Sequence, residues 1–241
     1  MANFGFSHLA VVAPYEAHWR EAKSAIGAKD LLQNAKHTER LAEAVAECTL
    51  VVGTGTLEHR RPEQTVLALP ELGPRIQKEL EQGGRVALVF GPEKRGLTRD
   101  DLALCHLLVE IPTHPRQPSM NLGQAVAVCL YELAAREFRP VLDENVVGRP
   151  TLATSLSLSL RWGQKPADSN TTEAALACAH DLDLVAAVVA ETMQAANYSP
   201  AAMQKANRHD LNLLLRRLTL TQRDARRILG LFRRMLWRIR P

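Results

Sequence analysis

Short apolar runs alternate with longer amphipathic stretches along the first two-thirds of the chain. Four of these runs have the length and the Gly, Pro or Thr flanks that are typical of buried parallel strands. They are Leu9–Ala13, Leu50–Val52, Val86–Phe90 and Leu107–Ile111. The stretches between them have helical spacing and cover Ala17–Ile26, Thr38–Glu47, Gly73–Gln82 and Leu97–Cys105. This alternation predicts βαβ units, and therefore an α/β domain whose parallel sheet is covered on both faces.

Capping residues set the predicted limits of several helices. Thr38 suits the N-cap of the second stretch, and Gly83-Gly84 ends the third. A further apolar segment, Leu122–Phe138, predicts one long helix that Pro140 ends.

A second region follows, with a different composition. Residues 139–170 are rich in Pro, Ser, Thr and Gly, which is typical of a linker, although residues 151–160 alternate and an edge strand there is an alternative. Helical spacing returns over Thr172–Asn197. We therefore predict an α/β domain over residues 1–139, a linker over 140–171 and a helical extension over 172–241.

Two further signals describe the helical extension. Four leucines have the spacing of a core-facing helical stripe, and they are Leu211, Leu214, Leu215 and Leu218. Thr221 and Asp224 resemble a capping box that begins the last helix.

The composition excludes several classes of protein. The chain contains no run of about 18 apolar residues, so we expect no membrane-spanning helix. Its N-terminus lacks the basic and apolar regions of a secretory signal. The four cysteines are scattered and have no paired histidines nearby, which argues against a metal site or a disulfide framework. We therefore expect a cytoplasmic protein without a metal.

The charge is distributed unevenly. The net charge is +4, but residues 205–241 carry eleven Lys and Arg against two Asp, whereas the rest of the chain is acidic overall. A basic block of this kind indicates either a surface that meets a polyanion such as RNA or a solvated helix face, and charge alone does not separate the two.

Three segments that carry polar groups follow predicted strands. They are Val52–Thr56 (VGTGT), Phe90–Thr98 (FGPEKRGLT) and Pro118–Val126 (PSMNLGQAV). Ligands of open parallel sheets bind at the carboxyl ends of the strands, so these segments predict a ligand site. Taken singly, each also fits a plain turn, a charged surface loop or a helix cap.

The order and spacing of VALVFGPEKRGLT, LLVEIPT and PSMNLGQAVAVCLYEL resemble the SpoU-type branch of the SPOUT methyltransferases, and the length and tail resemble its TrmJ-like tRNA members. The resemblance runs from Met1 to about Arg136. It implies a parallel sheet with a C-terminal trefoil knot, a homodimer, and S-adenosyl-L-methionine as the cofactor. It places the cofactor on Thr54, Gly55, Thr56, Gly91, Ile111, Pro118, Ser119 and Met120. It also places Ser119, Asn121 and Glu93 in or beside the catalytic site.

The resemblance also implies a departure at the start of the chain. The chain begins just after the position of the family's first strand and N-x-G-x-x-x-R motif. The first strand and the arginine of this motif are therefore expected to be absent. Ser119 and Asn121 can orient a ribose hydroxyl, but neither is a competent base. We therefore expect this chain to bind the cofactor and to methylate poorly.

The leading hypothesis is methylation of an RNA ribose 2′-hydroxyl, in tRNA rather than rRNA. The basic tail would then neutralise RNA phosphates through Arg216, Arg217, Arg226, Arg227, Arg233 and Arg234. Two alternatives stay open: a catalytically impaired paralogue that binds RNA or dimerises, and base methylation by another SPOUT branch. No zinc-protease H-E-x-x-H or hydrolase G-x-S-x-G motif competes with them.

Overall fold

A computed structural model describes residues 1–15, 18–22, 25, 27–55, 62–137 and 175–240. Its α/β part holds a four-stranded parallel sheet in the order β4-β6-β3-β5. These strands are β3 (Leu50–Thr54), β4 (Val66–Ala68), β5 (Val86–Val89) and β6 (Leu107–Glu110). In the register of the central strand, Val52 lies opposite Leu88 of β5 and Leu107 of β6. The strands predicted at Leu50–Val52, Val86–Phe90 and Leu107–Ile111 are confirmed as β3, β5 and β6, whereas β4 was not predicted.

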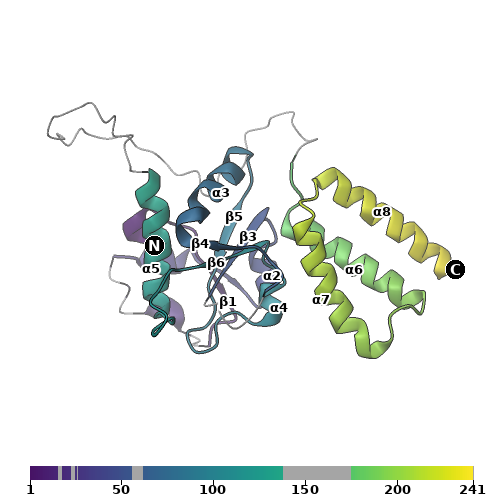
Figure 1. Cartoon of the computed structure of the whole chain (residues 1–241), viewed down its shortest axis with the longest axis horizontal. Helices are drawn as coiled ribbons and strands as arrows, with labels where there is room; N and C mark the ends of the chain where they lie inside the picture. The colour runs from purple at the N-terminus through teal and green to yellow at the C-terminus, as the bar shows by residue number, and fades with distance from the viewer. Residues whose placement is uncertain (16–17, 23–24, 26, 56–61, 138–174, 241) are drawn as a thin grey trace.

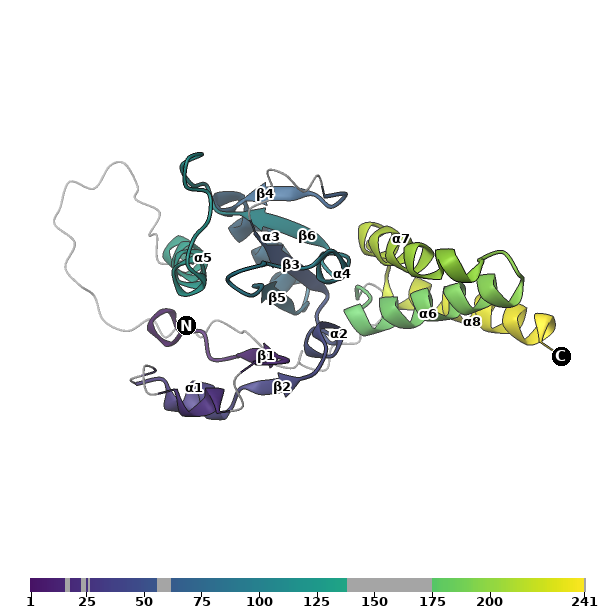
Figure 2. The same ribbon diagram turned by 90° about the horizontal axis from the view of Figure 1, so that it is seen from below.

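A separate two-stranded parallel sheet pairs β1 (Ala10–Val12) with β2 (Lys36–Thr38). Figure 2 shows it beside the larger sheet, on the side of β5. The prediction of one sheet was therefore incomplete. The β2 strand is polar along its three residues, so hydrophobic spacing gave no sign of it.

Helices cover the four-stranded sheet on both faces, as predicted (Figures 1 and 2). Successive residues of β3 point to opposite faces because strand side chains alternate. Leu50 and Val52 pack in one cluster with α3 (Leu69–Glu81) and α5 (Leu122–Glu137). Val51 packs in a second cluster on the other face, where α2 (Leu41–Ala44), α4 (Arg99–Leu102) and the start of α6 (Ala179–Ala195) contribute.

Several predicted helix limits were wrong. Thr38 ends β2, and the N-cap of α2 is Arg40. In place of the first predicted helix, the described residues contain a single 3₁₀ turn at Trp19–Glu21. Helix α3 begins at Leu69 rather than Gly73, because Pro70 suits a first helical turn. A short helix that was not predicted, α1, covers Lys29–Gln33.

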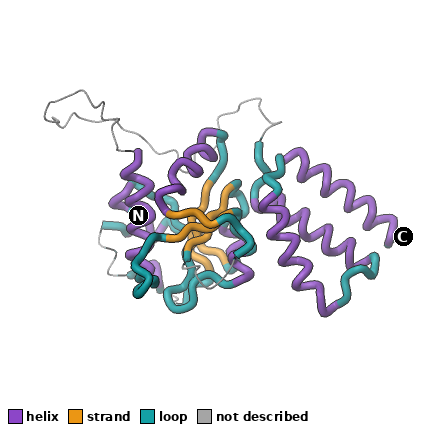
Figure 3. The backbone as a smooth tube through the Cα atoms, in the orientation of Figure 1, coloured by secondary structure: helices purple, strands orange, loops and turns teal. Residues whose placement is uncertain are grey.

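The C-terminal part is a unit of three helices, α6, α7 (Gln204–Arg217) and α8 (Gln222–Ile239), as Figure 3 shows. Helix α6 packs against both others around Leu182, Val185 and Leu215. Thr221 accepts a hydrogen bond from the Asp224 amide, so the predicted N-cap of α8 is confirmed. The leucine stripe was half wrong, because Leu214 and Leu218 are 43% and 49% exposed.

The three-helix unit is joined to the α/β part through the first turn of α6. This helix begins at Ala179, later than predicted, because Leu176 forms a β-bridge with Thr221. The Ala179 amide donates to the Cys48 carbonyl at 2.8 Å, and the His180 amide donates to the Ala46 carbonyl at 2.9 Å. These carbonyls satisfy amides that a helix start leaves without intrahelical partners.

The predicted linker lies outside the described residues, and so does its alternating stretch 151–160. The domain limits at 139/140 and 171/172 stay predictions for the same reason. The trefoil knot also stays a prediction.

Candidate functional site

A cavity of about 290 Å³ opens at the carboxyl ends of β3, β5 and β6. All three segments predicted to carry chemistry contribute to its lining. The predicted residues that line it are Thr54, Gly55, Gly91, Glu93, Ile111, Pro118, Ser119 and Met120. The sequence therefore placed the cavity at the correct edge of the sheet. Thr56, the remaining predicted cofactor residue, lies outside the described residues.

The loop after β5 is a tight backbone turn. The Gly96 amide donates to the Pro92 carbonyl at 2.7 Å, and Gly96 has a positive φ of 62°. A Cβ atom added at Gly91 would lie 2.2 Å from the Gly96 carbonyl carbon. Glycine is thus required at position 91 for the two ends of the loop to meet.

A hydrogen bond from a threonine hydroxyl joins two of the strands at the cavity. The Thr54 hydroxyl donates to the Val89 carbonyl at 2.9 Å, which ties the end of β3 to the end of β5. The Gly55 amide donates to the Val109 carbonyl of β6 at 3.3 Å. These bonds fix the spacing of the three strand ends beneath the cavity.

The loop between β6 and α5 closes another side of the cavity. The Thr113 hydroxyl donates to the Pro118 carbonyl at 3.2 Å and holds these two parts of the loop together. Ile111, Pro118 and Met120 then line the cavity. The cavity thus combines apolar side chains with backbone groups of the glycine loops, a mixture that is typical of sites for small organic ligands.

Asn121 connects two of the predicted segments. Its Nδ2 donates to Oε1 of Glu93 at 2.5 Å. Its Oδ1 accepts from the Gln124 amide at 3.3 Å, so the alternative that the third segment caps a helix is confirmed at Asn121, just before α5. Asn121 is not among the lining residues, whereas Glu93 and Ser119 are. The arrangement places the Glu93 carboxylate and the Ser119 hydroxyl at the cavity wall.

The sequence reasoning did not name several lining residues. They are Phe90, Pro92, Lys94, Arg95, Gly96, Leu97, Leu102, Thr113, Leu122 and Ala125. Most belong to the three quoted segments, so the strand-end rule could have found them. Leu102 follows from no such rule, because α4 folds back onto the cavity.

The cysteines are poor candidates for nucleophiles. All four are free thiols, and burial raises the pKa of Cys105 to about 12 and those of Cys48 and Cys129 to about 11. Burial also raises the pKa of Cys178. A thiol with a pKa this high is protonated at neutral pH and therefore unreactive.

Within the described ranges, three or more His, Cys, Asp or Glu side chains are nowhere close enough together to hold a metal ion. The described helices include none that is both long and apolar enough to cross a membrane.

Helix α8 carries a basic face that makes a candidate nucleic-acid interface. Its arginines recur at spacings of three, four and seven residues, which puts them on the side of the helix opposite buried Ala225. They are Arg223, Arg226, Arg227, Arg233, Arg234 and Arg238. Trp237 lies within this face and is 75% exposed.

The prediction that Arg216 binds RNA was wrong. Its side chain is only 1% exposed, and it forms an ion pair with Asp183. A buried and paired guanidinium is not available to a phosphate. Arg217, in contrast, is exposed at the end of α7.

Two curated relatives are similar to this chain. The tRNA (cytidine/uridine/adenosine-2′-O-)-methyltransferase TrmJ of Pseudomonas aeruginosa (strain UCBPP-PA14) is 39% identical over 161 residues, 65% of this chain and 62% of the relative. The tRNA (cytidine-2′-O-)-methyltransferase TrmJ of Methanocaldococcus jannaschii is 36% identical over 61% of this chain and 64% of the relative. The chain thus spans less than two-thirds of the length of these relatives.

A solved structure extends the likeness to the C-terminal helices. The crystal structure of TrmJ from Z. mobilis ZM4 matches with a TM-score of 0.74 and 25% identity, over 98% of this chain and 89% of that one. The model of the SpoU rRNA Methylase family matches residues 1–131, more than half of the chain. The α/β fold, the positions of the three segments and this match lead to one conclusion: the chain belongs to the SpoU rRNA methylase family.

Proposed function

We propose that this protein transfers a methyl group from S-adenosylmethionine to the ribose 2′-hydroxyl of a tRNA nucleotide. The observation that carries the proposal is the cavity at the ends of β3, β5 and β6, which three sequence-distant segments line. The names of the relatives from P. aeruginosa and M. jannaschii, both tRNA 2′-O-methyltransferases, support the choice of reaction and substrate.

The cavity suits the proposed cofactor. Leu97, Ile111 and Met120 offer apolar walls for a purine, and the backbones of Gly55 and Gly91 offer polar groups, the carbonyl in the case of Gly55, without side chains in the way. When bound, S-adenosylmethionine supplies an electrophilic methyl group on a sulfonium sulfur. We assign cofactor binding to Thr54, Gly55, Thr56, Gly91, Ile111, Pro118, Ser119 and Met120.

The residues of the chain orient the substrate. A ribose hydroxyl is a weak nucleophile at neutral pH, so alignment with the methyl group is the main requirement, and alignment lowers barriers by roughly 7–11 kcal/mol. The Ser119 hydroxyl at the cavity wall can hydrogen-bond to the ribose. Asn121 holds Glu93 in place, and the Glu93 carboxylate at the cavity wall can accept the released proton.

The arginine face of α8 provides the proposed contact with tRNA. Exposed guanidinium groups neutralise phosphates without reading sequence, and Trp237 offers a surface on which a base can stack. The free thiols fit a reducing compartment, such as the cytoplasm in which tRNA is modified.

A homodimer is part of the proposal. Val128 and Tyr131 are large apolar residues that are exposed on the outer face of α5. A second copy of the chain packed on this face would bury them and lie next to Ser119 and Asn121, which come just before the helix.

Methyl transfer from radiolabelled S-adenosylmethionine to purified tRNA tests the proposal. A 2′-O-methyl group protects the adjacent phosphodiester bond from alkaline cleavage, so the expected result is label in tRNA and one gap in the alkaline ladder. The matched control is the same tRNA with 2′-deoxyribose at that position, which should take no label.

The other outcomes identify the alternatives. Label without a gap in the ladder would indicate base methylation and overturn the ribose assignment. Cofactor binding, measured by calorimetry, without any label in tRNA or rRNA would indicate a catalytically impaired paralogue.

A further inference from the structure

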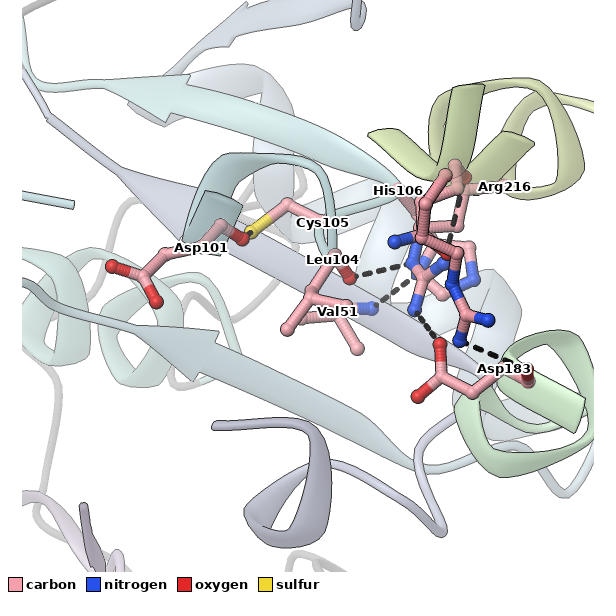
Figure 4. A network of polar contacts seen from close by, with 9 residues as sticks. Val51, Asp101, Leu104, Cys105, His106, Asp183 and Arg216 are labelled. Carbon is pink, nitrogen blue, oxygen red and sulfur yellow. Dashed lines mark hydrogen bonds and ion pairs between the residues drawn. The ribbon is translucent and has the colours of Figure 1, made fainter. Parts of the chain in front are cut away.

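Arg216 lies where α7 meets the α/β part of the chain (Figure 4). Its Nε donates to the Leu104 carbonyl at 2.8 Å, and its Nη2 donates to Oδ1 of Asp183 at 2.9 Å. Figure 4 shows the guanidinium between these two acceptors, which come from different parts of the chain. The planar guanidinium can satisfy both at once, and a lysine ammonium reproduces this geometry poorly.

The Leu104 carbonyl belongs to the segment that forms one wall of the cavity. Helix α4 ends at Leu102, two residues earlier, and both Leu102 and Leu97 line the cavity. The Gln64 side chain donates to the Leu102 carbonyl at 2.6 Å. The position of α4 therefore determines the position of this cavity wall.

Helix α7 contacts the start of α4 as well as its end. Lys205 forms an ion pair with Asp100 at 3.2 Å, and Arg99 Nε lies 3.1 Å from Nε2 of His209. Lys205, His209 and Arg216 are separated by four and seven residues, so they share one face of α7. The contacts of Lys205 and His209 are exposed and contribute little each, whereas the Arg216 side chain is buried and its partner Asp183 is 21% exposed.

We propose that Arg216 is a positioning residue for the cofactor cavity. By holding the Leu104 carbonyl, it fixes α4 and keeps Leu97 and Leu102 at the cavity wall. It thereby makes the three-helix unit, which carries the arginine face, part of the support of the cofactor site. The inference rests on the proposed function in one respect, that this cavity binds S-adenosylmethionine.

The first test compares two arginines of α7 in the full chain. Arg216→Met removes the buried donors and keeps the length of the side chain, and Arg217→Met removes an exposed guanidinium beside it. Calorimetry with S-adenosylmethionine should give a dissociation constant about five- to tenfold higher for Arg216→Met and unchanged for Arg217→Met. Amide hydrogen exchange should become faster at residues 99–105 and stay unchanged in β3.

A double variant tests whether the weaker cofactor binding arises merely from a loss of folding. Arg216→Met leaves the Asp183 carboxylate without its partner, which is costly in itself. Arg216→Met/Asp183→Leu removes both charges, so the lost donors are those to two backbone carbonyls, Leu104 at 2.8 Å and Asn212 within α7 at 3.4 Å. We expect the same weakening of cofactor binding as in Arg216→Met, and partial recovery in Arg216→Lys, which can still donate to one acceptor.

The outcomes separate the two proposals. Cofactor affinity and α4 exchange equal to wild type in a folded double variant would overturn the role of Arg216. If the wild-type chain itself does not bind S-adenosylmethionine, the proposed function fails. In that case, faster exchange at residues 99–105 still supports the role of Arg216 in holding α4, and unchanged exchange overturns it.

Discussion

The Asn121 side chain donates to the Glu93 carboxylate with 2.5 Å between Nδ2 and Oε1. The two residues are 28 positions apart, and the bond joins the loop after β5 to the start of α5. Both loops border the cavity, so this bond sets their separation. An amide beside a carboxylate also satisfies that carboxylate without adding a second charge.

Substitutions at this pair should depend on charge. Asn121→Ala should lower kcat/KM about 10- to 100-fold, because a hydrogen bond to a charged group is lost. Asn121→Asp should be worse at pH 8, since two carboxylates then face each other, and should recover as the pH falls and they share a proton. The free energy of unfolding of Glu93→Gln/Asn121→Asp, which restores an amide–carboxylate pair, provides the check, because this readout does not depend on Glu93 as a proton acceptor. A double variant no more stable at pH 8 than Asn121→Asp would contradict the pairing argument.

Gly91 should tolerate no side chain. In Gly91→Ala, the added Cβ would lie 2.2 and 2.3 Å from backbone atoms of Gly96 and Leu97, so the loop must open. We expect cofactor binding to weaken by more than about tenfold and the free energy of unfolding to fall by about 1–3 kcal/mol. Calorimetry and urea unfolding measure these two changes.

Gly230 in α8 is the matched control for this substitution. A Cβ added there has no neighbour within 4 Å, and glycine weakens a helix interior. Gly230→Ala should therefore raise the free energy of unfolding by about 0.5–1 kcal/mol and leave cofactor binding unchanged. Equal effects of the two substitutions would argue against the steric account of Gly91.

The cavity was predictable because parallel strands deliver their carboxyl ends to one edge. Ile111 ends an apolar run, and Thr54 and Gly91 come just after two others, and that placement alone brings the three together. The strand β2 was not predictable in this way, because its three residues are polar and pairing with β1 makes it a strand. The strand β4 is apolar but was not predicted, and its three residues lead directly into α3.

Arg216 shows a different limit of the sequence. It stands in a run of basic residues and resembles its neighbour Arg217 in every local respect. Its partners, Leu104 and Asp183, are 112 and 33 positions away, so burial follows only from tertiary packing. The periodicity of α8, in contrast, is local, and its basic face is readable from the sequence.

His106 should make the stability depend on pH. Its Nδ1 accepts from the Val51 amide at 3.0 Å (Figure 4). Burial first, and then the charges of Arg216 and Arg75, lower the pKa of His106 from 6.5 to about 3. Below about pH 6.5 the unfolded chain therefore binds a proton at His106, whereas the folded chain binds this proton only below about pH 3. The free energy of unfolding should fall as the pH drops through this window, by at most about 1.4 kcal/mol per pH unit.

Urea unfolding at pH 7.5 and pH 5.5 measures this dependence. His106→Gln keeps an acceptor for the Val51 amide and cannot be protonated, so it should lose the part of the pH dependence that His106 causes. A wild-type chain and a His106→Gln variant with the same change in unfolding free energy between the two pH values would contradict the assignment.

The basic face of α8 should govern the salt dependence of tRNA binding. Arg233→Gln/Arg234→Gln removes two exposed charges from that face, whereas Lys29→Gln/Lys78→Gln removes two from the α/β part. Each lost phosphate contact should reduce the slope of log K against log salt by about 0.7–0.9. We therefore expect a slope smaller by about 1.4–1.8 for the α8 variant only. Both variants change the net charge equally. Equal slopes would therefore mean that tRNA binding depends on the total charge rather than on this face.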